Sequence, residues 1–168
     1  DLAAILEKVC GAPFAVRSGD GKDGLAVGTA GDFPALALKD EFDGEPLRRR
    51  EQYILRSHPD GLLAVAAEAS GVEPAVSDLL HRLGYRRFFP GRAWEIVPRS
   101  QELSLAVDAK EAPSFASRRI WYGFGELAEN SGAFDEWRRR NRVPGAYEIE
   151  TGHAYEDIVR RNRAQFDA

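Results

Sequence analysis

Residues 69–91 carry the clearest pattern of apolar and polar positions in the chain. Their apolar residues recur every three or four positions, which places them on one face of a helix. Gly84 follows the last of them and suits a left-handed cap at the helix C-terminus. A short aromatic segment, residues 85–89, comes next and is ended by Pro90 and Gly91, so the spacing predicts a helix that leads directly into a strand. The apolar face consists of Val72, Ala75, Val76, Leu79, Leu80 and Leu83.

Polar residues predict where this helix begins. Ser70 and Glu73 are spaced as a capping box, in which each side chain bonds to the backbone of the other residue. Pro74 falls in the predicted first turn, where no backbone donor is lost. We therefore expect a capped helix whose apolar face packs on a sheet. By itself this segment defines a fold element and carries no chemistry.

The residues before this helix predict a second helix and three strands. Residues 2–9 have the same helical spacing and are followed by Gly11. The stretch 29–46 contains several breakers and is expected to be mostly loop. Two of the strands flank a His-Pro-Asp-Gly turn at residues 58–61 and are expected to form a hairpin. The predicted strands cover residues 25–28, 53–56 and 62–66.

The residues after the aromatic segment predict a change of domain. Residues 103–107 alternate as in a half-buried strand, and residues 111–113 suit a linker. Beyond the linker, the order strand, helix, strand, helix is typical of parallel α/β units, although two units are too few to close a barrel. We expect an α+β domain over residues 1–112, with a mixed sheet and helices packed on it, and strand–helix units over residues 113–168. The predicted elements of that second part are strands 118–122 and 146–150, a helix around Phe134 and Trp137, and a helix over 155–166.

Composition and charge exclude few classes of function. The 168 residues, 43% of them hydrophobic and 30% charged, are typical of a globular protein that can bury its own core. The net charge of −4 gives no general attraction to nucleic acid or to an anionic membrane, so neither partner is expected. No apolar run approaches the ~20 residues of a membrane span, and no signal peptide is found. A start at Asp1, inside a predicted helix, is expected of a mature or trimmed fragment, so the missing signal says little about compartment.

The common signatures of catalytic and metal sites are not found in the sequence. There is no P-loop, dinucleotide fingerprint, nucleophile elbow or HExxH motif, and we expect no metal or cofactor. Cys10, the only cysteine, is expected to be a small buried hydrophobe. His58 and His81 are expected on the solvated surface. The arginine runs at 138–142 and 160–163 are expected to be solvated helix faces, with phosphate binding as the alternative.

Two groups of residues are candidates for substrate binding, and the first follows the predicted strand 146–150. If that strand belongs to a parallel barrel, His153 and Tyr155 lie at its C-terminal end, with Glu150 pointing toward or beside the same place. That end of the strands carries the active site in such barrels. Alternatively, His153 caps the next helix.

The second group is Arg118, Trp121 and Tyr122. Aromatic rings stack on pyranose faces, and an arginine can form a bidentate pair with a sugar carboxylate. Alternatively, Trp121 and Tyr122 are core or interdomain packing residues. Glycoside hydrolysis needs two carboxylates ~5 to 9.5 Å apart, and the acidic residues of the tail show no spacing that selects such a pair. No catalytic residue is therefore assigned.

Residues 70–98 also resemble a known protein family. The run Leu-Gly-Tyr-Arg-Arg-Phe-Phe-Pro-Gly at 83–91, followed by Glu-Ile-Val-Pro at 95–98, is similar to the N-terminal domain of bacterial α-glucuronidases and of β-N-acetylhexosaminidases. Residues 112–118 resemble the segment that leads into the first barrel strand of those enzymes. The nearest likeness is to uncharacterised bacterial proteins with the same domain arrangement, in which runs like 137–141 and 152–155 are typical.

The resemblance implies an accessory, non-catalytic α+β domain beside a catalytic TIM barrel. The parent would be a glycoside hydrolase acting on uronic-acid or N-acetylhexosamine carbohydrate, which binds through the adjoining barrel, and it would be secreted or periplasmic. The catalytic groups are expected from strands beyond Ala168, and the first strand of the family is expected ahead of Asp1. The fragment itself is expected to be inactive. The sugar, the linkage and the oligomeric state are left open.

Two other functions are compatible with the sequence. One is a carbohydrate-binding or protein-interaction module without hydrolysis. Further strand–helix units downstream, with acidic residues at the strand ends, would favour the enzyme over the module. The other is an arginine-rich nucleic-acid binder, which the acidic net charge disfavours.

Overall fold

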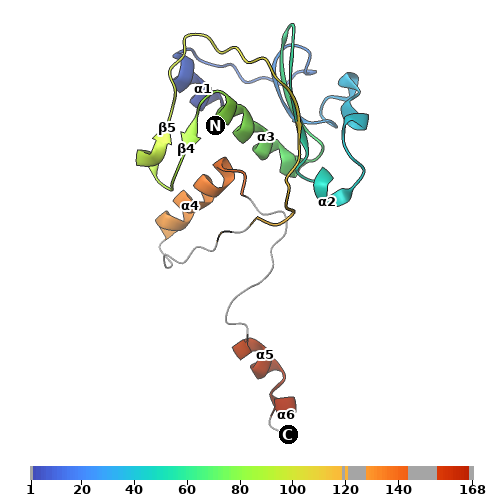
Figure 1. Cartoon of the computed structure of the whole chain (residues 1–168), viewed down its shortest axis with the longest axis vertical. Helices are drawn as coiled ribbons and strands as arrows, with labels where there is room; N and C mark the ends of the chain where they lie inside the picture. The colour runs from blue at the N-terminus through green and yellow to red at the C-terminus, as the bar shows by residue number, and fades with distance from the viewer. Residues whose placement is uncertain (1, 119, 121–127, 144–154, 167–168) are drawn as a thin grey trace.

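The computed structural model describes residues 2–118, 120, 128–143 and 155–166 (Figure 1). Its centre is a four-stranded mixed sheet in the order β1-β3-β2-β6. β2 (Tyr53–His58) and β3 (Gly61–Ala66) form the predicted antiparallel hairpin. β1 (Gly24–Thr29) runs parallel to β3, and β6 (Asp108–Glu111) runs antiparallel to β2. The predicted class, α+β with a mixed sheet and helices packed on it, is therefore confirmed.

Different kinds of segment cover the two faces of the sheet. α1 (Leu2–Cys10) and α3 (Ala69–Arg82) lie on one side, with α4 (Ala128–Arg140) beside α3 (Figure 1). The opposite face is covered by the connection between β1 and β2. That connection holds two short 3₁₀ helices, η1 (Pro34–Leu36) and η2 (Leu38–Glu41), and the one-turn helix α2 (Pro46–Arg49).

Alternate residues of the hairpin fill two separate apolar cores. Ile54 and Val65 are register partners and pack with Phe33 on the loop-covered face. Leu55 and Ala64 are also partners and pack toward α3. Because successive strand residues point to opposite faces, the unbroken apolar run of β3 serves both cores.

The predicted central helix is confirmed as α3, and its end has the expected geometry. Gly84 has a φ of +92°, a conformation that glycine adopts without strain. The N–H of Gly84 donates to the carbonyl of His81 at 3.0 Å, and that of Tyr85 donates to Leu80 at 2.9 Å. These two bonds form a Schellman cap, which turns the chain so that Tyr85 packs with Leu80 against α1.

The predicted start of this helix is wrong. Glu68 occupies the N-cap position and makes no side-chain capping bond. Ser70 lies inside the first turn, where its hydroxyl donates to the carbonyl of Arg50, and Glu73 forms an ion pair with α4. Pro74 therefore lies more than one turn into the helix. Because proline has no N–H, the helix lacks one backbone hydrogen bond at this position. The side chains of Ser70 and Glu73 bond to residues distant in sequence and not to each other's backbone, as a capping box would require.

The aromatic segment after α3 forms only a short strand outside the main sheet. β4 (Arg86–Arg87) pairs antiparallel with β5 (Glu95–Ile96), and the 3₁₀ helix η3 (Arg92–Trp94) lies between them. Residues 103–107 alternate in burial as predicted, yet the ladder with β2 starts only at Asp108. Ser57 explains the late start, because its hydroxyl and N–H bond the backbone of Val107 at 2.9 and 2.7 Å.

The second part of the chain confirms one predicted helix directly, because α4 contains Phe134 and Trp137. Arg118 and Ile120 lie in no strand, and the other residues of the predicted strand 118–122 are outside the described part, as is the whole of 146–150. Whether residues 113–168 open a barrel therefore stays a prediction. The last predicted helix is divided at Asn162. The two pieces are α5 (Tyr155–Arg161) and α6 (Arg163–Phe166).

Two smaller findings concern the surface. Cys10 is partly exposed, with its thiol 3.7 Å from the carbonyl of Ala12, so its predicted burial is wrong. Over the described ranges, no helix has both the length and the apolar character needed to cross a bilayer.

Candidate functional site

Arg118 is the one predicted binding residue whose side chain the structure describes. Tyr155 is described only as the first residue of α5. Whether the two predicted groups meet in space stays a prediction. The other four candidates, Trp121, Tyr122, Glu150 and His153, lie outside the described residues.

Arg118 lies in a polar cluster that connects the sheet to the residues after Pro113. We call this cluster the joint, and define it as Glu51, Tyr53, Asp78, Arg118 and Arg142. Tyr53 is the first residue of β2, Glu51 lies two positions before it, and Asp78 comes from α3. The two arginines flank α4 in sequence. The joint therefore combines residues up to 91 positions apart along the chain, from Glu51 to Arg142.

All three nitrogens of the Arg118 guanidinium are engaged. Nη2 donates to the carboxylate of Glu51, Nε to the carbonyl of Arg142 at 3.0 Å, and Nη1 to the carbonyl of Phe115 at 2.7 Å. Glu51 is 2% exposed, so its charge is compensated away from water by this one ion pair. A sugar carboxylate that displaced Glu51 from Arg118 would leave a buried carboxylate without its ion pair.

A second set of contacts surrounds Asp78, which is buried on α3. Its carboxylate pairs with Nε of Arg82 at 3.2 Å and with Nη1 of Arg142 at 3.3 Å. The same Nη1 donates to the hydroxyl oxygen of Tyr53 at 3.1 Å. Burial, and after it the charge of Asp78, raises the pKa of Tyr53, so this phenol remains a neutral hydroxyl.

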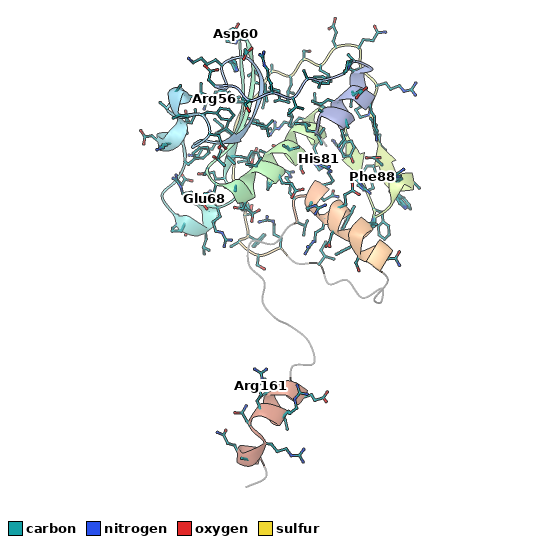
Figure 2. All side chains as sticks on the ribbon, turned by 180° about the vertical axis from the view of Figure 1, so that it is seen from behind. Arg56, Asp60, Glu68, His81, Phe88 and Arg161 are labelled. Carbon is teal, nitrogen blue, oxygen red and sulfur yellow. The ribbon has the colours of Figure 1, made fainter. Side chains whose placement is uncertain are left out.

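α4 and the turn after it cover residues that we expected in solvent. His81 is half-buried on α3 beside α4 (Figure 2). Burial lowers the pKa of His81, and the charges of Arg142 and Arg86 lower it further. Arg140 is buried, and burial lowers the pKa of its guanidinium. The predicted solvation is therefore wrong for His81 and for Arg140, whereas Arg139 in the same run is exposed as predicted.

A cavity of about 290 Å³ lies beside the joint. Oε1 of Glu51, which lines it, is buried and has no hydrogen-bond partner. Two carboxylates and two guanidiniums balance in charge around the cavity, which suits water or a small neutral polar group rather than an ion. No His, Cys, Asp or Glu side chains in the described ranges gather in threes as a metal site would need. The charged lining residues are Glu51, Glu111, Arg118 and Arg142.

Sequence reasoning missed Glu51, Tyr53 and Asp78. Glu51 follows three arginines and has the pattern of an exposed, charged approach to a strand. Asp78 stands four residues before Arg82, a spacing that is common on solvated helix surfaces. Tyr53 is buried in the core between the sheet and α3, and Glu51 and Asp78 pair with Arg118 and Arg142, which lie outside their own elements. No local signal in the sequence gives these partners.

The chain was compared with known protein families, with curated proteins and with solved structures, and none of the three comparisons gave a match. The resemblance of residues 72–98 to the accessory domains of glycoside hydrolases therefore stays a prediction.

Proposed function

We propose that this chain is the accessory N-terminal region of a carbohydrate-active glycoside hydrolase. In this proposal the α+β unit holds the opening strand–helix segment of a catalytic barrel in a fixed position. The observation that supports it most is the joint, where buried charges of the sheet unit pair with arginines from the following segment.

The joint supports a positioning role because any displacement of the two segments that separates its ion pairs costs free energy. Removing one partner of a buried ion pair leaves an uncompensated charge, which costs about 3–5 kcal/mol. Further contacts tie α4 to the same unit: Ser77 Oγ donates to the carbonyl of Arg139 at 3.3 Å, and Arg87 pairs with Glu136 at 2.6 Å. Several polar contacts with different directions define one docking geometry, whereas an apolar contact alone tolerates sliding.

The chemistry of the joint argues against catalysis within this unit. Each guanidinium is already engaged by a carboxylate or a carbonyl, and Tyr53 remains neutral. The one described histidine near the joint, His81, has a lowered pKa, yet it has no nucleophile beside it among the contacts of the described residues. The phrase at residues 83–98 supports the family in which such a unit stands beside the catalytic barrel.

The test is a screen of chromogenic uronosides and N-acetylhexosaminides. It is run on this chain and on the full-length parent protein. We expect hydrolysis by the parent and none by this chain, and a loss of activity in the parent when Arg118→Ala undocks the barrel segment. Hydrolysis by the 168-residue chain alone, or a parent without glycosidase activity on any member of the panel, would overturn the proposal.

A second candidate function is a carbohydrate-binding module without hydrolysis. One observation favours it, namely the exposed aromatic rings on the β4–β5 arm. The discriminating result is a parent that binds polysaccharide through this unit but hydrolyses none of the glycosides.

A further inference from the structure

Large apolar side chains are concentrated on a small projection of the molecule. We call residues 86–96, which comprise β4, η3 and β5, the aromatic arm. It lies at the edge of the molecule beside α4, and Phe88 is labelled on it (Figure 2). Each of its four large apolar side chains is more than half exposed. They are Phe88, Phe89, Trp94 and Ile96.

The rings of the arm are held in place. The N–H of Phe88 donates to the carbonyl of Trp94 at 3.1 Å, which closes the loop between the two strands. The Phe89 ring lies 5.9 Å from the Trp94 ring and 6.4 Å from that of Trp137 on α4, measured between centroids. A preorganised aromatic surface loses little conformational entropy on binding, which is how exposed rings gain affinity.

Polar contacts fix the base of the arm. The hydroxyl of Tyr85 donates to Oε1 of Glu95 at 2.6 Å, and the buried Arg87 pairs with Glu136. Asn141 donates from Nδ2 to the carbonyl of Arg87 at 2.9 Å. The exposed rings therefore sit on a rigid support and not on a free loop.

The arm carries an excess of positive charge, because Arg86, Arg87 and Arg92 outnumber its one carboxylate, Glu95. Glu136 is paired with Arg87, and Glu95 accepts a hydrogen bond from the neutral hydroxyl of Tyr85. Arg92 is exposed, begins η3 two residues before Trp94, and takes part in no ion pair found in the described parts of the chain. In a protein with a net charge of −4, this leaves an exposed cation two positions along the chain from an exposed indole.

The exposed rings and the nearby charges favour one class of partner over the others. A single-stranded nucleic acid uses a row of rings for successive bases and many cations for its phosphates. Here the neighbouring rings are tilted by 63° and 50°, and the whole chain is acidic. A membrane would have to desolvate the carboxylates of Glu95 and Glu136 beside the rings. A sugar offers an apolar ring face for an indole and hydroxyls for the carboxylates, and an acidic sugar adds an anion for the arginine.

We propose that the aromatic arm binds an anionic polysaccharide, with a sugar ring stacked on Trp94 and a carboxylate or sulfate group paired with Arg92. The inference rests on the proposed function, because it assigns to the accessory unit the anchoring of carbohydrate outside the barrel. It differs from the predicted site at Trp121 and Tyr122, which belongs to the segment after Pro113.

The experiment measures binding of the 168-residue chain by affinity electrophoresis and by tryptophan fluorescence. The probes are polygalacturonate, dextran sulfate and uncharged dextran. We expect binding to at least one anionic polymer and at least fivefold weaker binding to dextran. Preference for polygalacturonate would identify carboxylates as the recognised group, and preference for dextran sulfate would identify sulfates. Binding to neither anionic polymer, or equal binding to dextran, would overturn the proposal.

Variants locate the binding surface. Trp94→Ala is expected to weaken binding roughly tenfold, in the range found for loss of a stacking ring, and Arg92→Ala about threefold. Phe115→Ala removes an exposed aromatic ring, 72% accessible, that is remote in sequence from the arm, and it should bind as the unchanged chain does. Equal effects of Trp94→Ala and Phe115→Ala would contradict the proposal, and so would tighter binding to oligothymidylate or to anionic phosphatidylserine vesicles. Because the readout is binding by this chain, its failure is distinct from an absence of hydrolysis in the parent.

Discussion

The sheet–α3 core and the joint lie next to each other, yet different forces stabilise them. The core consists of fully buried aliphatic residues such as Leu55, Ala64 and Leu80. The joint pairs the buried carboxylates of Glu51 and Asp78 with the partly exposed guanidiniums of Arg118 and Arg142. Apolar burial is non-directional and tolerates exchanges of similar volume, whereas a buried ion pair tolerates neither removal nor rotation of a partner. The comparison indicates that the core stabilises the sheet unit, whereas the joint fixes the position of α4 and its flanking residues on that unit.

Leu55→Ala tests the core and should have the largest effect. Leu55 is fully buried between the sheet and α3, so truncation leaves a cavity and costs about 4 kcal/mol of unfolding free energy. The measurement is urea denaturation followed by circular dichroism. Leu47→Ala, at an exposed position in α2, is the matched control and should cost well under about 1 kcal/mol. Similar costs for the two variants would mean that the described core does not carry the stability.

Arg118→Ala tests the joint and should come second. It leaves Glu51 buried without its ion pair and should cost about 3 kcal/mol. The loss should be local, releasing α4 before the sheet unfolds. Hydrogen exchange distinguishes local release of α4 from global unfolding, because amide protection should fall in α4 while β2 and β3 keep theirs. Rescue is expected in the double variant Glu51→Leu with Arg118→Leu, which removes both charges. Uniform loss of protection over the sheet would contradict the comparison.

Gly84→Ala should have a smaller effect, because it acts on the backbone at the end of α3. An alanine in the left-handed conformation costs about 1–2 kcal/mol. A Cβ at this position would meet Pro98 only at an ordinary contact distance of 3.6 Å, so the cost is conformational. Gly132→Ala, inside α4 and with open space around it, should instead stabilise by about 0.5–1 kcal/mol. Thermal denaturation of the two variants measures the contrast, and equal shifts in midpoint would show that the cap is unimportant.

His81 should give the smallest effect, a pH dependence. Its pKa is lowered in the folded protein, so the unfolded chain binds the proton first as pH falls. The stabilising contribution of neutral His81 is therefore complete above the ordinary pKa of 6.5 and is lost progressively as pH falls below it. His81→Gln should flatten the stability profile between pH 7 and pH 5, as urea denaturation at each pH would measure. An unchanged slope in His81→Gln would show that other groups set the pH dependence.

The sequence predicted the parts of the fold that depend on local signals. The three-and-four spacing of α3, the left-handed Gly84 and the turn at residues 58–61 are each encoded within a few positions. The capping box failed because the partner of Ser70 is the carbonyl of Arg50, which only the folded chain brings near. A motif of four residues contains no information about a carbonyl 20 positions away.

The joint shows the same limit more strongly. Arg118 was selected for its chemistry, and its partner Glu51 lies 67 positions earlier in a stretch that has the pattern of solvated surface. The exposure of Phe88 and Trp94 was missed for the opposite reason, since aromatic residues in a strand pattern usually pack inward. Local patterns predict which residue types lie on one face, and the position of the next element decides whether that face is covered.

α4 and the turn after it contact both the aromatic arm and the joint, and this has a thermodynamic consequence. Trp137 on the helix lies against Phe89 of the aromatic arm, while Arg142, just beyond the helix end, reaches Asp78 in the joint. Docking of the helix and occupancy of the arm are therefore linked equilibria, and linkage is reciprocal. If a bound polymer increases the equilibrium constant for docking of α4 by some factor, docking of α4 increases the binding constant for that polymer by the same factor. A substrate held at the rim of the molecule would thereby tighten the seating of the segment that follows, without entering the interior.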